Sequence, residues 1–286
     1  MEIYIAKGAG FCFGVKRAVD MAFRTAERSV KRVATLGPII HNPQVVEKLC
    51  QAGVKPLEGV SEDVDILIVR THGITAELYE SLREAKLELI DATCPFVKKA
   101  QRYAKLLRDE GYQVLILGDK DHPEVRGILS YAGENAVVVR DAEDVPSLNS
   151  RVGIVVQTTQ PVEALKRLLD RVIQTVKEVK VYNTICNSTA LRLKETEAMT
   201  KRVDIMLVVG GRNSANTKQL VTLCNDCGVR TYHVETADDL VAEWFDGVKK
   251  VGITAGASTP DWIISDIVKK IKAVGDVAFS SKGRES

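Results

Sequence analysis

The sequence lacks several features that would assign it to a familiar class at once. It has no run of 18 apolar residues, no block of like charges and no signal-peptide core near its start, and its 286 residues carry a net charge of +2. These absences argue against a membrane-spanning, a secreted and a nucleic-acid-binding protein. We therefore expect a cytoplasmic protein whose partner is a small molecule, with no nucleic acid and no membrane involved.

Cysteines are also few, and the role expected of them depends on whether the cellular compartment is oxidising or reducing. The six cysteines are Cys12, Cys50, Cys94, Cys186, Cys224 and Cys227. In a reducing cytosol such residues bind metals, act in catalysis or lie buried and inert, and a disulfide framework is not expected. Each cysteine therefore needs its own explanation.

What the chain does have is a series of short, continuous apolar runs separated by amphipathic helical stretches. Examples are "DILIVR", "QVLILG" and "DIMLVVG", in a chain that is 45% hydrophobic. Continuous apolar character is typical of parallel strands that are covered on both faces. The sequence predicts an α/β fold with mostly parallel sheets, whose functional loops follow the carboxyl ends of the strands.

An internal repeat organises these runs. The segments "RVATLGPIIHNPQVVEKL", "QVLILGDKDHPEVRGIL" and "DIMLVVGGRNSANTKQLV" each have a strand, a glycine, a polar residue four positions later and a helix. The glycines follow a cysteine by 24 or 25 residues, and a second strand later in each unit ends in polar residues. The repeat-equivalent sets are Gly37, Gly118 and Gly210; His41, His122 and Ser214; Pro43, Glu124 and Asn216; His72, Thr158 with Thr159, and Ser258; and Cys12, Cys94 and Cys186.

The repeat predicts three small α/β units at 14–94, 95–186 and 187–275, followed by a C-terminal tail at 276–286. The first two units end in a strand that leads to a cysteine, whereas the third has no such strand and the chain begins with an unmatched one. We expect the strand within 1–13 to join the third sheet and close a trefoil-like ring. In such a ring the three repeated cysteines would face one another around a central metal site.

The three repeated cysteines each lie between a strand and a helix, where the helix dipole favours a thiolate. A single one of them is as well explained as a small buried hydrophobic residue. Three at equivalent positions favour a shared metal site. Zinc prefers four protein ligands or a mixture with histidine, whereas three thiolates fit a [4Fe–4S] cluster with one iron not ligated by protein.

The polar residues at the strand ends are donors of the kind that bind phosphate oxygens beside helix N-termini. They are His41, His72, His122, Ser214, Asn216 and Ser258. Glu124 is the one carboxylate at a helix start in this set, and it suits a proton relay oriented by Thr158 or Thr159. The alternative is an ordinary first-turn glutamate stabilised by the helix dipole. His233 falls outside the repeat and is expected to be structural.

The pair Cys224 and Cys227 forms a C-x-x-C motif in an unfavourable context. A redox pair normally opens a helix after a strand, but here the motif follows the helical segment "NTKQLVTL" and no second pair completes a zinc site. Cys50 lies on an amphipathic helical segment and is expected in the core, and Trp244 and Trp262 are expected to be packing residues.

The motifs "GFCFGVKRAV", "DATCPFV", "DHPEVRG", "VQTTQ", "NSAN" and "TAGASTPD" together resemble the LytB/IspH family, collinearly over almost the whole chain. The resemblance implies reductive dehydration of 4-hydroxy-3-methylbut-2-enyl diphosphate to isopentenyl and dimethylallyl diphosphates, the last step of the methylerythritol phosphate pathway. It also implies a [4Fe–4S] cluster held by Cys12, Cys94 and Cys186, whose open iron takes the substrate hydroxyl and whose two electrons drive the reduction.

The resemblance assigns roles to the remaining site residues. Glu124 would be the proton donor, with Thr158 and Thr159 orienting the substrate hydroxyl. The diphosphate would lie among His41, His72, His122, Ser214, Ala215, Asn216 and Ser258. The chain departs from the family at Ala215, where a second serine is common, so that only the backbone N–H is offered there.

No nicotinamide or flavin site is evident, and electrons are expected from an external donor of the ferredoxin or flavodoxin type. Two rival functions stay open at this point. One is a phosphate-binding protein with a structural zinc in the three-cysteine centre, and the other is a dithiol redox protein that uses Cys224 and Cys227.

Overall fold

The computed structural model describes residues 1–59 and 63–282, in which strands and helices alternate along the chain. The chain divides into two compact units. The smaller unit comprises Met1–Phe13, His41–Val45 and Leu191–Ser286, and the larger unit comprises Gly14–Ile40 and Val46–Ala190. Within the described residues, no helix is long and apolar enough to span a bilayer.

The larger unit contains two four-stranded sheets in which all the strands are parallel. The first sheet has the order β3 (Lys55–Leu57), β2 (Val33–Leu36), β4 (Ile66–Val69) and β5 (Glu88–Asp91). The second has the order β7 (Val137–Val139), β6 (Gln113–Leu117), β8 (Arg151–Val156) and β9 (Glu178–Tyr182). Apart from the first residues of β6 and β8, Gln113 and Arg151, the central strands are buried, as expected of parallel strands covered on both faces.

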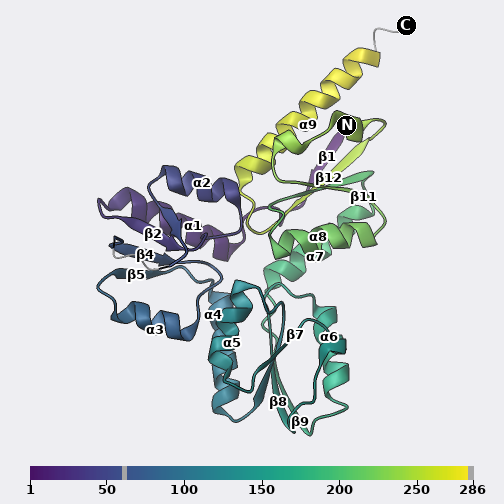
Figure 1. The fold of residues 1–286 in the computed structure, drawn as a ribbon. Helices are drawn as coiled ribbons and strands as arrows, with labels where there is room; N and C mark the ends of the chain where they lie inside the picture. The colour runs from purple at the N-terminus through teal and green to yellow at the C-terminus, as the bar shows by residue number, and fades with distance from the viewer. Residues whose placement is uncertain (60–62, 283–286) are drawn as a thin grey trace. The chain divides into compact units, whose positions relative to one another are not determined.

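Helices cover both faces of the second sheet (Figure 1). Side chains of α4 (Pro95–Asp109) and α5 (Pro123–Ala132) form one core with the sheet, and those of α6 (Val162–Val172) form the other. Gly153 of β8 allows α4 to approach closely, because a Cβ there would lie 2.5 Å from Cδ2 of Leu107. Further helices are α1 (Phe13–Arg28), α2 (Pro43–Gln51), α3 (Ala76–Glu84) and the short 3₁₀ helix η1 (Ala142–Asp144).

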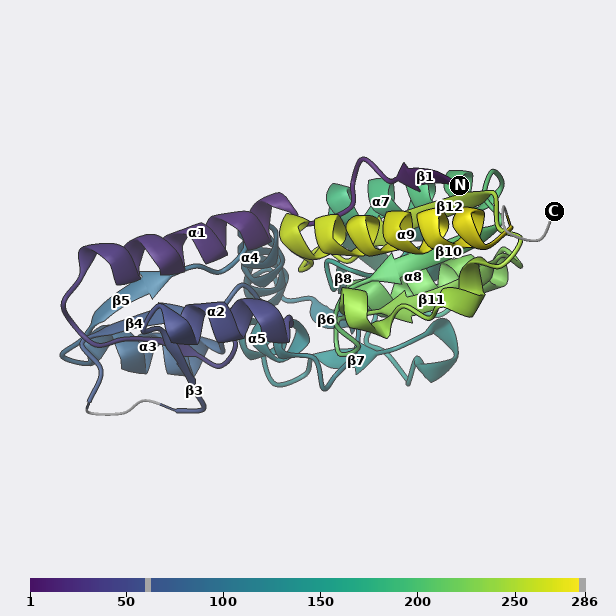
Figure 2. The same ribbon diagram turned by 90° about the horizontal axis from the view of Figure 1, so that it is seen from above.

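The smaller unit contains one parallel sheet with the order β1 (Glu2–Ile5), β12 (Lys250–Ala255), β10 (Ile205–Val209) and β11 (Arg230–Val234). Helix α9 (Asp261–Lys282) runs along one face of this sheet (Figure 2). Residues of α7 (Asn187–Thr200) and α8 (Ala215–Asp226) pack on the other face. Two 3₁₀ helices, η2 (Ala237–Asp239) and η3 (Ala242–Phe245), lie between β11 and β12.

The first strand joins the sheet of the smaller unit, as the orphan strand of the sequence predicts. β1 runs parallel to β12 with Glu2 opposite Lys250 and Ile5 opposite Ile253. The α/β class with parallel sheets is confirmed. The ring of three units, their boundaries at 14–94, 95–186 and 187–275, and the central metal site stay predictions.

Some local expectations differ from the structure. Strand β3 was not anticipated, because it is only three residues long and includes Pro56. Helix α9 extends through Lys282, into the segment 276–286 that was predicted as a tail, and residues 283–286 lie outside the described part of the chain. Cys50 is only half-buried rather than part of the core.

Two packing predictions and one structural histidine are confirmed. Trp244 and Trp262 both pack against the apolar core of the smaller unit. His233 lies 2.8 Å through Nε2 from the carbonyl oxygen of Gly210, so its ring links β11 to the end of β10.

Candidate active site

The three repeated cysteines share one backbone arrangement. In each sheet the cysteine N–H donates to a carbonyl two residues past the end of the neighbouring central strand. The bonds run from Cys12 to Ala257 over 3.1 Å, from Cys94 to Thr71 over 2.9 Å and from Cys186 to Thr158 over 2.8 Å. The three cysteines thus occupy equivalent backbone positions beside their own sheets. None of the six cysteines forms a disulfide.

Cys94 lies at the N-cap of α4, with Pro95 at the first helical position. The thiol therefore faces the positive end of the helix dipole, which favours a thiolate. Gly14 at the start of α1 leaves room for it, because a Cβ at that position would lie 2.5 Å from Sγ of Cys94. Arg17 of α1 donates to the carbonyl oxygens of Thr93 and Asp91 and ties the two segments together.

The loop that leads to Cys12 is held by two charged residues of α7. The Glu195 carboxylate accepts hydrogen bonds from the backbone N–H groups of Lys7, at 2.5 Å, and Gly8, at 2.8 Å. Arg192, only 3% exposed, donates to the carbonyl oxygens of Ala255, at 2.5 Å, and Gly10, at 3.1 Å. The residues before Cys12 are therefore fixed by charge-assisted bonds that the sequence did not reveal.

The C-x-x-C cysteines have different surroundings. Helix α8 continues through Asp226, further than the sequence indicated, so Cys224 lies inside the helix and Cys227 caps its end. Cys224 is fully buried, and burial raises the pKa of its thiol to about 12, whereas Cys227 is exposed. A thiol with so high a pKa is a poor nucleophile at neutral pH, which argues against the dithiol redox reading.

Glu124 is buried at the first turn of α5, where it is 2% exposed. Its Oε1 accepts the backbone N–H of Thr158 at 2.7 Å, and its Oε2 accepts the Thr158 hydroxyl at 2.9 Å. Burial raises the pKa of Glu124 to about 7, and the two hydrogen bonds from Thr158 offset part of that rise. A carboxyl group with this pKa holds a proton that it can give up near neutral pH.

His122 is the N-cap residue of α5, and its Nδ1 accepts the backbone N–H of Glu124 at 3.2 Å. Since Nδ1 is an acceptor, the neutral ring carries its proton on Nε2, which is then a donor toward a ligand. His72 lies edge-on to His122, with ring centroids 5.4 Å apart. The larger unit thus brings two of the predicted histidines together beside Glu124.

Thr159 differs from its neighbour Thr158 in having an unused hydroxyl. Its Oγ1 is buried and has no hydrogen-bond partner among the described residues. A buried polar atom left without a partner costs free energy, so such atoms mark places where a ligand or water supplies the bond. Thr158 therefore holds Glu124, whereas the Thr159 hydroxyl takes no part in holding it.

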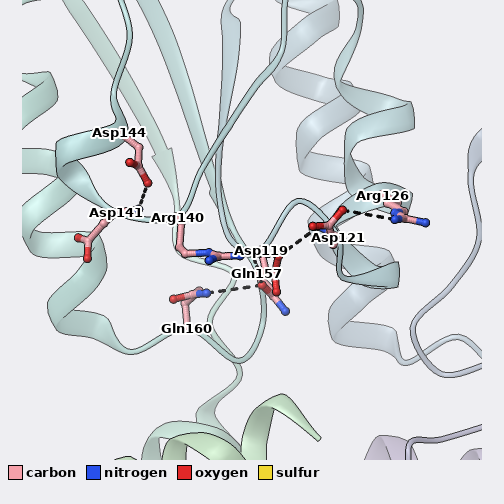
Figure 3. Close-up of polar contacts among 8 residues, drawn as sticks. All are labelled: Asp119, Asp121, Arg126, Arg140, Asp141, Asp144, Gln157 and Gln160. Atoms are coloured by element: carbon pink, nitrogen blue, oxygen red, sulfur yellow. Dashed lines mark hydrogen bonds and ion pairs between the residues drawn. The ribbon is translucent and has the colours of Figure 1, made fainter. Parts of the chain in front are cut away.

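The loop between β6 and α5, which carries His122, is fixed by a polar network that sequence reasoning missed (Figure 3). The Gln157 side chain accepts the backbone N–H of Asp119 at 3.0 Å, and the Asp119 carboxylate accepts the N–H of Asp121 at 3.1 Å and pairs with Arg140 at 3.2 Å. Asp119 lies in a quoted repeat segment and Gln157 in the motif "VQTTQ", but their role depends on contacts between separate loops.

The smaller unit carries a second set of donors. Ser214 caps α8 by accepting the N–H of Thr217, and Ala215 is the first residue of that helix. Asn216 accepts the N–H of Ala257 through Oδ1 at 3.0 Å, while its buried Nδ2 has no partner among the described residues. Ser258 lies with its hydroxyl 3.5 Å from the carbonyl oxygen of His41. These four positions and His41 therefore belong to one compact unit.

The helix cap in the first copy of the repeat differs from the caps in the other two copies. His122 and Ser214 cap their helices, but at the corresponding place the cap of α2 is Asn42, whose side chain accepts the N–H of Val45 at 3.1 Å. Asn42 was therefore missed, although asparagine before a helical segment is a usual N-cap signal.

Comparison with known proteins places the chain in a family. The family model described as LytB protein matches residues 3–272. The chain is 49% identical over 283 residues to the 4-hydroxy-3-methylbut-2-enyl diphosphate reductase of Geobacter metallireducens, covering 98% of this chain and 100% of that protein. It is 51% identical over 278 residues to the protein of the same name from Geobacter sulfurreducens, covering 95% and 97%.

Two solved structures are also similar. One is (E)-4-hydroxy-3-methyl-but-2-enyl diphosphate reductase, the terminal enzyme of the non-mevalonate pathway, with a TM-score of 0.74 and 46% identity over 96% of this chain and 100% of that chain. The other is the E-1-hydroxy-2-methyl-but-2-enyl-4-diphosphate reductase of Plasmodium falciparum, with a TM-score of 0.88 and 27% identity over 94% and 87%. The chain therefore belongs to the LytB family.

Proposed function

We propose that this protein is a cytoplasmic enzyme that reduces 4-hydroxy-3-methylbut-2-enyl diphosphate to isopentenyl and dimethylallyl diphosphates. The substrate is the one named for its relatives, which match nearly the full chain. The observation that carries the proposal is the bonding of Thr158, whose N–H and hydroxyl hold the buried Glu124 and whose carbonyl holds Cys186. A proton donor and one of the repeated thiols are thereby fixed by a single residue.

The donor set fits a [4Fe–4S] cluster with one iron not ligated by protein. Cys12, Cys94 and Cys186 have the same backbone arrangement, and the missing side chain of Gly14 lets the Cys94 sulfur lie against α1. Three thiolates without a fourth suit such a cluster better than zinc. When bound, the cluster would supply electrons and an iron that is open to the substrate.

The diphosphate is expected to bind polar donors and helix starts. The residues proposed for this role are His41, His72, His122, Ser214, Ala215, Asn216 and Ser258. The unpartnered Asn216 Nδ2 and the Nε2–H of His122 are donors that suit phosphate oxygens. Backbone N–H groups at the start of α8 add to the attraction for an anion.

Glu124 serves as the proton donor. The reaction consumes two electrons and two protons, breaks the carbon–oxygen bond of the allylic alcohol, releases water and forms one carbon–hydrogen bond. A carboxyl group with a pKa of about 7 is protonated in a useful fraction of molecules at neutral pH and can be recharged from solvent. Thr158 keeps its oxygens in place, and the Thr159 hydroxyl is offered to the substrate. The electrons come from an external carrier of the ferredoxin or flavodoxin type.

Replacing Glu124 with Gln tests the proton role under anaerobic conditions with a chemical reductant. Since general acid catalysis contributes roughly 10²- to 10⁴-fold, we expect turnover to fall at least about 100-fold while bound iron is unchanged. Glu163, an exposed first-turn glutamate of α6, is the matched control, and Glu163→Gln should retain activity. Wild-type turnover by Glu124→Gln would contradict the proton role, and a colourless protein with stoichiometric zinc would contradict the cluster.

A further inference from the structure

Helix α4 exposes apolar and basic side chains together on one side. Phe96 and Leu106 are 39% and 38% exposed, although large apolar residues of a surface helix usually face the core. At about 100° per residue, Phe96, Lys99, Arg102, Tyr103 and Leu106 fall within an arc of about 120°. The adjoining arc, which includes Val97, Ala100 and Leu107, is buried, and Ala100 and Leu107 belong to the core of the second sheet. The exposed arc is thus a coherent face.

An aromatic pair joins this face to the edge strand β9. The rings of Tyr103 and Tyr182 stack with centroids 3.9 Å apart and planes 4° from parallel. Both rings are partly buried against the core of the second sheet. We call the set of Phe96, Lys99, Arg102, Tyr103, Leu106 and Tyr182 the tyrosine surface.

The charge of the tyrosine surface is positive. Helix α4 has five basic residues and one acidic residue. Lys98 pairs with Asp91, and Lys105 and Arg108 pair with Asp109. Lys99 and Arg102 instead lie over the Tyr103 ring, 5.6 and 5.4 Å from its centroid, and within the described residues no carboxylate is within ion-pairing distance of either. Two cations are therefore available to an acidic partner.

The elements that form the tyrosine surface connect directly to two of the three repeated cysteines. Helix α4 begins immediately after Cys94, and Tyr182 ends the strand that leads to Cys186. Aromatic and arginine side chains surrounded by charge are typical of protein interfaces, and complementary charge speeds association. We infer that the tyrosine surface is the docking site for the acidic electron carrier, an inference that rests on the proposed function.

Charge reversal tests the docking site. The double variant Lys99→Glu with Arg102→Glu is compared with Lys166→Glu with Arg171→Glu on α6, which changes the net charge equally on the other face of the sheet. The probe is an acidic plant-type [2Fe–2S] ferredoxin, titrated in its oxidised form onto the cluster-loaded enzyme by calorimetry. We expect the α4 variant to bind at least tenfold more weakly and the α6 variant to bind within twofold of wild type. The variant Lys99→Arg with Arg102→Lys keeps both positive charges and should bind within twofold of wild type.

Rising salt should weaken ferredoxin binding to wild type, because exposed charges are screened, and should affect the α4 variant much less. Equal binding by wild type and the α4 variant, or no binding by wild type, would overturn the inference. Self-association of wild type that the α4 variant abolishes, with ferredoxin binding unaffected, would assign the surface to a second copy instead. Turnover with reduced methyl viologen is measured separately, so failure of the proposed function shows there and not in the binding data.

Discussion

At the scale of single residues, Thr158 is the most connected position of the candidate site. Its N–H and hydroxyl both donate to Glu124, and its carbonyl accepts from Cys186. Despite these two hydrogen bonds, burial dominates and raises the pKa of the Glu124 carboxyl to about 7. From the sequence alone, Glu124 could be an ordinary first-turn glutamate. The structure shows that its carboxyl group is buried.

This pKa predicts a pH dependence of stability in the cofactor-free protein. Between about pH 4.5 and 7 the native state binds more protons than the unfolded state, so the free energy of unfolding falls as pH rises through this window. The contribution lost is about 3 kcal/mol. Urea unfolding at a series of pH values should show this fall in wild type and in Glu163→Gln but not in Glu124→Gln. A wild-type curve parallel to that of Glu124→Gln would mean that the pKa of Glu124 is ordinary.

At the scale of elements, α7 has two functions in the fold. It begins directly after Cys186, and its residues Arg192 and Glu195 hold the loop that precedes Cys12. The loop is also held by the backbone bonds of Ala6 to Ile253 and of Cys12 to Ala257 and by the edge contact of Phe11 with Trp262. The charge-assisted bonds to the loop come from one face of one helix.

Replacing Arg192 with Met should loosen that loop. The change leaves the carbonyl oxygens of Gly10 and Ala255 without their donor, at a cost of about 2 kcal/mol in the free energy of unfolding. Amide hydrogen exchange of residues 6–12 should accelerate, and iron content after reconstitution should fall. Arg202→Met, at an exposed position after the same helix, is the control and should change neither quantity. Unchanged exchange in residues 6–12 would show that Arg192 does not hold the loop.

At the scale of the whole molecule, the proposed cluster ligands are spread along the chain from Cys12 to Cys186. A group that binds the native state but not the unfolded one raises the apparent stability of the entire protein. The three cysteines occupy equivalent places beside three sheets. A ligand common to all three would therefore raise the stability of all three sheets together.

Removal of iron should therefore lower the melting temperature and bleach the brown colour together. Anaerobic thermal melts followed by circular dichroism measure the first effect, and visible absorption spectra before and after chelation measure the second. Serine at position 12, 94 or 186 should each reproduce the iron-free melt, whereas Cys224→Ser should retain colour because that thiol is buried and away from the repeat. If a single serine variant at 94 kept full iron content, Cys94 would not be a ligand.

Several features could be predicted from the sequence because they depend on local pattern. Runs such as "DIMLVVG" form buried strands in any parallel sheet, and the orphan run at 2–5 had one vacant place to pair. The repeat also predicts that His122 and Ser214 stand at helix starts, where the structure has them as caps. Strand β3 was not predicted because it is short and contains Pro56. The cap Asn42 was not predicted because, in the first copy of the repeat, the cap lies one residue later than in the other two.

The sequence by itself determined the α/β class, the repeat and the identity of the thiols and donors at the strand ends, since these depend on residue type and spacing along the chain. Only the tertiary structure decided that Glu124 is buried against Thr158, that Arg192 and Glu195 hold the Cys12 loop, and that Tyr103 stacks on Tyr182. Burial and hydrogen bonding join residues that lie far apart in the chain. Such contacts follow from which elements pack together, and a linear pattern does not specify them.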